Sequence, residues 1–227
     1  MGSKKICKPD DENYIFSEGI DYSRTGDVSI WGKGDPDMLN FLLGTEISGS
    51  WLNLAAGDGR YSSILLEKAK KVISCDIDES ALCKLRRNTP EKFRAKLCTE
   101  TFDITRKFPF EDHYFDGIFC SGTLHLFPKE VLKKIFAEMD RVLKPNGKVI
   151  IDFAADITRK SPEGNLITFG DEPLYTMERA KCLLKSIFRN YETNMFESEV
   201  TEDYERANPP YRLDCKFVIL SGKKNGS

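Results

Sequence analysis

The sequence predicts an α/β fold: a seven-stranded, mostly parallel sheet with helices on both faces. The first observation is that five short apolar runs alternate with helical patterns between residues 50 and 153. The second is a glycine-containing turn directly after the first of these runs. The third is a pair of extended segments, at 192–200 and 212–221, with no helix between them, which predicts an antiparallel last strand.

An arm and one helix precede the first strand. Residues 1–35 are polar, contain several glycines and aromatic side chains, and predict an irregular arm. Asp35 is a suitable N-cap, and Pro36 suits the first turn of a helix that runs to about residue 43. Gly44 is expected to end this helix.

The sheet is predicted from apolar runs of strand length. The five expected parallel strands cover residues 51–55, 71–75, 95–99, 115–120 and 148–153. The fourth of these runs is apolar almost throughout, as in a strand that is covered on both faces. Helices are expected at residues 61–70, from residue 78 onward, at 128–143 and at 176–188. A chain of 227 residues fits a single domain, divided into an arm and first helix at 1–49 and two further parts at 50–153 and 154–227.

Composition and charge argue against several classes of protein. The formal net charge of −2 provides no general attraction for nucleic acid, which would need a local basic patch. No apolar run approaches the roughly 20 residues of a membrane helix, and the N-terminus lacks the apolar stretch of a secretion signal. The seven cysteines never occur at Cys-x-x-Cys spacing. We therefore expect a cytoplasmic protein without a metal site.

The turn between the first two strands has the features of a nucleotide-binding unit. The first run leads into Gly57 and Gly59, and the second run ends at Asp76. Glycine allows a ligand to approach the backbone closely, because a Cβ would block it. Asp76 follows Gly57 by 19 residues, close to the spacing of about 20 in dinucleotide-binding units. Its carboxylate is suited to accept both ribose hydroxyls, which predicts an adenosine-containing cofactor.

The order of these and later motifs resembles that of the class I S-adenosylmethionine-dependent methyltransferases, particularly the type 11 group. The resemblance covers about residues 50–153, with a looser match through residue 221. The matching segments are the glycine motif at 53–59, the fourth strand at 115–119, the loop beyond it at 124–127, and the turn at 141–147. The resemblance implies a Rossmann-like fold, S-adenosyl-L-methionine as the cofactor and methyl transfer as the reaction. It makes residues 50–153 the cofactor-binding half and residues 154–227 the acceptor-side half.

The resemblance also implies which residues bind the cofactor. Asp76 is expected to hold the ribose and Asp103 the adenine amino group, with Ile77 and Ile104 on the two faces of the ring. The full set is Asn53, Ala55, Ala56, Gly57, Asp58, Gly59, Asp76, Ile77, Asp103, Ile104, Cys120 and Ser121.

Two positions in the glycine motif depart from the family pattern. Asn53 stands where the family has an acid, and Ala55 stands where it has its first glycine. Asparagine can still form a hydrogen bond, but it removes a negative charge near the cofactor's ammonium group. Alanine is acceptable where the backbone stays in the β region, and this is our expectation for Ala55.

His125 is the candidate catalytic residue. It lies just beyond the fourth strand, where an imidazole is placed to take a proton from an acceptor. The alternative is a loop histidine that positions the main chain. A base is required only when the acceptor must lose a proton, because alignment of the two reactants supplies much of the rate.

The acceptor pocket is expected to be lined by aromatic side chains beneath two lids, the N-terminal arm and the polar stretch at 156–173. Candidate lining residues are Tyr14, Tyr22, Trp31, Phe169 and Tyr175. The sequence Asn208-Pro209-Pro210-Tyr211 matches the signature of amino-methylating enzymes. It lies between the last two extended segments rather than after the fourth strand, so a rigid loop is expected there.

The sequence thus predicts an S-adenosylmethionine-dependent methyltransferase that acts on a small molecule. The alternatives are an RNA or protein methyltransferase of the same fold, a cofactor-binding module without catalysis, and a nicotinamide-dependent oxidoreductase. The last is considered because Gly57-x-Gly59-x-x-Ser62 approaches the dinucleotide fingerprint. The serine at its third position, the lack of a Tyr-x-x-x-Lys pair and the antiparallel ending argue against it.

Overall fold

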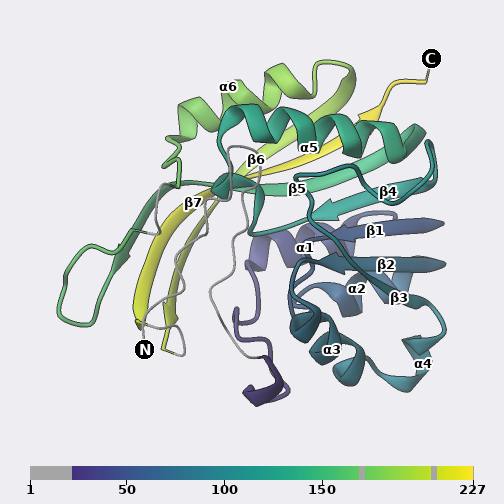
Figure 1. The fold of residues 1–227 in the computed structure, drawn as a ribbon. Helices are drawn as coiled ribbons and strands as arrows, with labels where there is room; N and C mark the ends of the chain where they lie inside the picture. The colour runs from purple at the N-terminus through teal and green to yellow at the C-terminus, as the bar shows by residue number, and fades with distance from the viewer. Residues whose placement is uncertain (1–21, 169–171, 206–208, 227) are drawn as a thin grey trace.

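A computed structural model describes residues 22–168, 172–205 and 209–226, and its centre is a seven-stranded sheet in the order β3-β2-β1-β4-β5-β7-β6 (Figure 1). β7 is antiparallel to both of its neighbours, while the pairs from β3 to β5 are parallel. The strands are β1 (Ser50–Leu54), β2 (Lys71–Asp76), β3 (Leu97–Thr101), β4 (Phe115–Cys120), β5 (Leu143–Lys160), β6 (Tyr191–Tyr204) and β7 (Tyr211–Lys224). The predicted fold class is confirmed.

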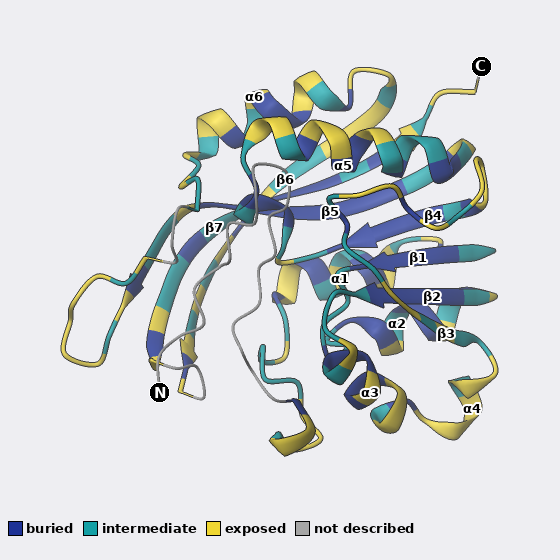
Figure 2. Ribbon diagram, viewed as in Figure 1, coloured by how far each residue is buried: buried dark blue, intermediate teal, exposed yellow. Residues whose placement is uncertain are grey.

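Helices cover both faces of this sheet (Figures 1 and 2). They are α1 (Pro36–Gly44), α2 (Ser62–Lys68), α3 (Glu79–Asn88), α4 (Glu91–Arg94), α5 (Lys129–Val142) and α6 (Met177–Ile187), with the 3-10 turns η1 (Tyr22–Arg24) and η2 (Leu124–Leu126). Within the described part of the chain, no helix is long and apolar enough to cross a membrane.

The core consists of two layers because successive strand residues point to opposite faces of the sheet. In β1, Leu52 and Leu54 belong to the layer that packs under α5 and α6. Trp51, between Ser50 and Leu52 in the chain, belongs to the layer that packs against α1 and α2. Figure 2 shows the resulting buried sheet between helices whose outer faces are exposed.

Two predicted boundaries near the start of the sheet are corrected by local structure. The sequence places the third strand at 95–99, whereas residues 91–94 form α4 and the strand follows at 97–101. The expected helix at 61–70 ends at Lys68, because Ala69 is extended at the helix C-cap. Asp78 caps α3 as expected, since its carboxylate accepts a hydrogen bond from the backbone N–H of Ser80 at 2.8 Å.

The largest correction concerns the end of the fifth strand, predicted at residue 153, and the polar stretch at 156–173 that follows it. Its first residues continue β5 as far as Lys160, paired with β7 across a register shift between Ala155 and Thr158. β6 and β7 are correspondingly longer than predicted. In Figure 1, β5, β6 and β7 continue past the ends of β1, β2 and β4. We call this overhang, residues 156–160, 200–204 and 211–217, the ribbon.

The close contact between β1 and β4 yields a stability prediction. Trp51 lies opposite Gly117, and a Cβ at Gly117 would lie 2.3 Å from Cε2 of the Trp51 side chain. Gly117→Ala should therefore lower the free energy of unfolding by about 1–3 kcal/mol through overpacking. Gly44→Ala is the control, because a Cβ there meets nothing within 4 Å. Equal denaturation midpoints for the two variants would contradict the packing described.

Candidate functional site

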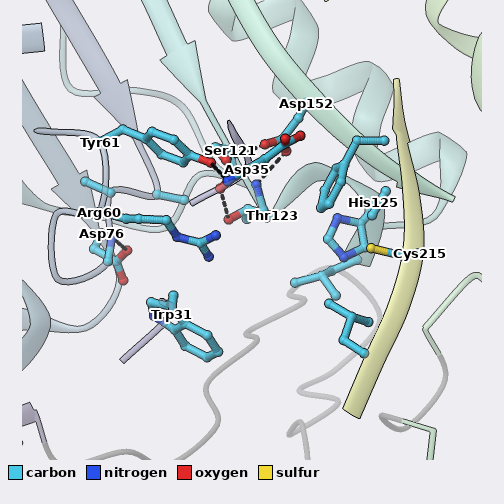
Figure 3. A pocket seen from close by; sticks show the side chains of 18 of the residues that line it. Trp31, Asp35, Arg60, Tyr61, Asp76, Ser121, Thr123, His125, Asp152 and Cys215 are labelled. Atoms are coloured by element: carbon cyan, nitrogen blue, oxygen red, sulfur yellow. Dashed lines mark hydrogen bonds between the residues drawn. The ribbon is translucent and has the colours of Figure 1, made fainter. Parts of the chain in front are cut away.

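A cavity opens at the carboxyl ends of β1, β2 and β4, bounded on its other side by the ribbon (Figure 3). This edge is where open α/β sheets bind ligands. The glycine turn, the loops after β2, β3 and β4, the segment before α1 and the ribbon all contribute lining residues. In Figure 3, Asp76 and Arg60 lie on one side of the cavity, while His125 and Cys215 lie beside β7.

The Asp76 carboxylate holds the glycine turn against the end of β2. Its Oδ2 accepts a hydrogen bond from the Gly57 N–H at 2.8 Å, and its Oδ1 accepts one from the Asp78 N–H at 3.0 Å. Burial raises the pKa of this carboxyl, against the lowering effect of the two N–H donors. Each carboxylate oxygen can accept a second hydrogen bond, so the group is able to accept from the two hydroxyls of a diol.

The backbone of the turn corrects our expectation for Ala55. Its φ is 51°, in the left-handed region, and not in the β region as expected. Gly57 follows with a φ of 53°, a conformation that glycine adopts without strain. A Cβ at Gly57 would lie 3.6 Å from Nε1 of Trp31, so this indole lies close to the turn at Gly57.

Asn53 lies at the floor of the cavity and is almost fully buried. Its Nδ2 donates hydrogen bonds to Oγ of Ser62 at 3.1 Å and to Oγ of Ser74 at 3.3 Å. The amide thus joins β1 to α2 and β2. The side chain that makes these bonds is neutral, at a position where the family has an acid.

Ten of the predicted site residues line the cavity and three do not. Those that line it are Asn53, Ala55, Ala56, Gly57, Asp76, Ile77, Asp103, Ile104, Ser121 and His125. Asp58 turns away, because its carboxylate forms an ion pair with Lys84. Gly59 faces Leu85 of α3, and Cys120 lies in the core, where burial raises the pKa of its thiol.

Asp103 lines the cavity from the loop after β3. Its Oδ1 accepts hydrogen bonds from the backbone N–H of Thr105 at 2.8 Å and from the Thr105 hydroxyl at 2.7 Å. Its Oδ2 lies 3.6 Å from Arg106. These contacts fix the carboxylate at the cavity wall.

Asp152 is a site residue that sequence reasoning missed. It lies on β5, is 3% exposed, and accepts hydrogen bonds from the Gly122 N–H at 2.7 Å and from the Ser121 hydroxyl. Burial raises the pKa of this carboxyl to about 6, in opposition to those two donors. The signal in the sequence is a lone acid within the apolar run at 149–155.

Arg60 is a second missed residue, and its side chain extends into the cavity (Figure 3). Burial acts to lower the pKa of the guanidinium, but Tyr204, Tyr61 and Glu202 outweigh it and raise the pKa. Arg60 directly follows the glycine motif, so its place in the sequence was the available signal. It brings a rigid fork of N–H donors to the site.

His125 lies in η2 at the cavity wall, and its ring is edge-on to Phe153. Burial, together with the nearby charge of Arg159, lowers the pKa of the imidazole to about 3. Its Nδ1 is buried and has no hydrogen-bond partner among the described residues. The structure therefore presents a neutral imidazole at the cavity wall, with a buried Nδ1.

Aromatic rings line the side of the cavity nearest the ribbon. The rings of Trp31 and Tyr204 are 6.1 Å apart, and those of Tyr204 and Tyr211 are 5.1 Å apart. Tyr22 also lines the cavity, as predicted. Tyr175 does not line it; its hydroxyl donates to the Phe127 carbonyl at 3.0 Å.

The remaining predictions for this region have mixed outcomes. Tyr14, Phe169 and Asn208 lie outside the described residues. Pro209 and Pro210 precede β7, and Tyr211 is the first residue of that strand. Among the described residues, no cluster of His, Cys, Asp or Glu is arranged to hold a metal ion.

Replacing Ala55 with glycine should stabilise the fold. The left-handed backbone costs an L-residue roughly 1–2 kcal/mol, and glycine avoids this cost. Glycine also loses more chain entropy on folding than alanine does, which offsets about 0.5–1 kcal/mol of the gain. The expected gain in the free energy of unfolding for Ala55→Gly is up to about 1 kcal/mol. Ala56→Gly is the control, since Ala56 has no positive φ and should lose stability. If both variants lose stability equally in urea, Ala55 is not strained.

Asp152 should give the fold a specific pH dependence. Its pKa is about 6 in the folded chain and 3.8 as a free group, so the folded state holds the proton more tightly. Its contribution to stability therefore falls as pH rises from about 4 to about 6. The unfolding free energy of the wild type minus that of Asp152→Asn should fall by about 2 kcal/mol over this range. A difference that is constant with pH would contradict an elevated pKa.

Comparison with known proteins gives the same family as the motifs. Residues 52–151 match a family model described as a methyltransferase domain. A demethylmenaquinone methyltransferase of Beutenbergia cavernae is 29% identical over 61% of this chain and 50% of its own length. A glycine/sarcosine N-methyltransferase of Parasynechococcus marenigrum is 30% identical over 62% of this chain and 50% of its own length. The chain thus spans about half the length of these curated relatives.

Solved structures share the fold at low sequence identity. A DhpI-SAH complex superposes with a TM-score of 0.58 at 16% identity, covering 85% of this chain and 84% of that one. A SAM-dependent methyltransferase from Aquifex aeolicus gives 0.53 at 19% identity, covering 82% and 89%. These structures share the predicted fold, and the match of residues 52–151 to the methyltransferase domain model agrees with the resemblance to the type 11 group.

Proposed function

We propose that this protein transfers a methyl group from S-adenosyl-L-methionine to a small-molecule acceptor. The observation that carries the proposal is the Asp76 carboxylate, fixed by the Gly57 and Asp78 N–H groups at the cavity edge. A carboxylate that is oriented in this way, beside an open glycine turn, is suited to the ribose diol of an adenosyl group.

The residues around Asp76 fit the adenosine half of the cofactor. Ile77 and Ile104 offer apolar surface on the two loops that flank the cavity, and Asp103 offers a fixed carboxylate oxygen for an amino group. Asp58, Gly59 and Cys120 are left out of the proposed contacts, because none of them lines the cavity.

The other half of the cavity is proposed to hold the methionine end and the acceptor. Ser121 and the fork of Arg60 offer polar contacts there, and the aromatic rings on the ribbon side offer apolar surface. The bound cofactor supplies a methyl group on a sulfonium, which needs alignment more than activation. Holding two reactants in line lowers the activation free energy by up to about 7–11 kcal/mol.

His125 is proposed to contact the acceptor as a neutral hydrogen-bonding group. Its pKa of about 3 means that a protonated imidazole is unfavourable at this position. We therefore assign His125 the role of orienting the acceptor and not that of accepting its proton. Its place in the cavity wall supports this role. Where an acceptor must lose a proton, the buried Asp152 has the better-matched pKa, about 6.

A small acceptor is supported by the way the site is enclosed. The ribbon and the segment before α1 bound the cavity opposite the cofactor-binding loops. Two of the relatives are named for small substrates, demethylmenaquinone and glycine or sarcosine. A cytoplasmic location is proposed on the free state of the described cysteines.

Calorimetry with S-adenosylhomocysteine tests the proposal. The wild type should bind it, and NAD should give no heat. Asp76→Asn should weaken binding roughly 10- to 100-fold, the effect expected from losing hydrogen bonds to a charged group. Asp203→Asn, an exposed acid outside the cavity, is the matched control.

A second ligand separates contact with the ribose from damage to the turn. The 2′-deoxyribose analogue of S-adenosylhomocysteine should bind the wild type more weakly than the parent compound. Asp76→Asn should discriminate less between the two ligands, because the hydroxyl's partner is already weakened. Binding of NAD without binding of S-adenosylhomocysteine would overturn the proposed function.

A further inference from the structure

A buried lysine joins three parts of the chain beside the glycine turn. The Lys84 side chain, from α3, has no exposed surface, and its Nζ lies 2.8 Å from Oδ2 of Asp58. The same Nζ donates to the Thr25 hydroxyl and to the Val28 carbonyl, each at 2.9 Å. We call residues 22–31, to which the last two belong, the arm segment.

Asp58 binds the arm segment from the other side of the same ion pair. Its Oδ1 accepts from the Ser29 hydroxyl at 2.6 Å, and its Oδ2 accepts from the Ile30 N–H at 2.9 Å. Four hydrogen bonds therefore connect the Asp58–Lys84 pair to the arm segment. We refer to the pair and these four bonds as the latch.

The arm segment brings two aromatic residues to the cavity. Tyr22 and Trp31 line it, and the Trp31 Nε1 donates to the Tyr22 hydroxyl at 3.2 Å. The same indole faces Gly57, which is next to Asp58 in the chain. The latch and the proposed cofactor contacts thus share one turn of backbone.

The energetics of burial make the latch cooperative. Removing two charges from water is costly unless pairing and hydrogen bonds compensate for it. The arm segment supplies two acceptors to Lys84 and two donors to Asp58, so its departure would leave both groups short of partners. Docking of the segment and the conformation of the glycine turn therefore favour each other.

We propose that Asp58 and Lys84 are positioning residues, which dock the arm segment as a wall of the cavity and couple its docking to occupation of the site. This inference rests on the proposed function for the identity of the ligand. Because such coupling is reciprocal, a ligand on the glycine turn holds the arm segment closed, and a closed segment tightens ligand binding.

Variants on the arm side test the latch and leave the buried pair intact. Ser29→Ala and Thr25→Val each remove a hydroxyl that bonds to the latch. Ser29→Thr keeps the hydroxyl and serves as the rescue. Val28→Ser is the matched control, because the Val28 side chain is 68% exposed and only its carbonyl takes part. Lys84→Met removes the cation as an independent variant.

Two readouts are measured on each variant. The first is trypsin cleavage after Arg24, within the arm segment, followed by mass spectrometry. The second is the Kd of S-adenosylhomocysteine. Ser29→Ala with Thr25→Val should speed cleavage and raise the Kd about tenfold, within the usual range for coupled sites. S-adenosylhomocysteine should slow the cleavage of the wild type, and the rescue and control should behave like the wild type.

The outcomes separate this inference from the proposed function. If the wild type binds S-adenosylhomocysteine and the double variant binds it equally well, the coupling is refuted. If cleavage after Arg24 is unchanged in the double variant and in Lys84→Met, the latch is refuted. If the wild type does not bind S-adenosylhomocysteine, the proposed function fails, and the cleavage rates alone decide whether the latch holds the segment.

Discussion

The Asp76 carboxylate connects the end of β2 to the turn that follows β1, and the shape of the cavity depends on this connection. By accepting from Gly57 and Asp78 at once, it sets the path of the glycine turn and the entry into α3. The left-handed backbone at Ala55 and Gly57 allows the turn to curl toward β2. The neutral Asn53 amide joins β1 to α2 and β2 beside this turn. A carboxylate that is held by main-chain donors remains oriented in the absence of a ligand, which is the arrangement that binding requires.

The site combines two parts of the sheet with different roles. The parallel part, from β3 to β5, presents loops at its carboxyl edge, and these loops carry the proposed cofactor contacts. The antiparallel part extends beyond that edge as the ribbon and closes the cavity with aromatic rings. Asp152 lies where the two parts meet, on β5, and bonds to the turn after β4. A single strand thus contributes to both parts of the sheet, and its buried acid lies between the proposed cofactor side and the proposed acceptor side of the cavity.

The sequence was sufficient for the parallel half and insufficient for the ribbon. Asp76 and Asp103 were predictable because strand ends and spacing place them at one edge of the sheet. Asp58 was misplaced because a motif position does not reveal where a side chain points, and its partner Lys84 comes from another helix. The extension of β5 to Lys160 was hidden in a polar stretch, since its pairing depends on long-range contacts with β7. Ala55 was expected in the β region because an alanine there avoids strain, whereas its φ is 51°. The torsions of the turn depend on contacts with β2 that the sequence does not reveal, such as the hydrogen bond from the Ala56 N–H to the Cys75 carbonyl.

The central claim is that the cavity above β1 and β2 holds the adenosyl end of a sulfonium donor. A crystal structure of the protein with S-adenosylhomocysteine tests it most directly. We predict that both ribose hydroxyls lie within hydrogen-bond distance of the Asp76 carboxylate and that the adenine lies between Ile77 and Ile104. Electron density for the ligand at any other place, or with its ribose turned away from Asp76, would contradict the account.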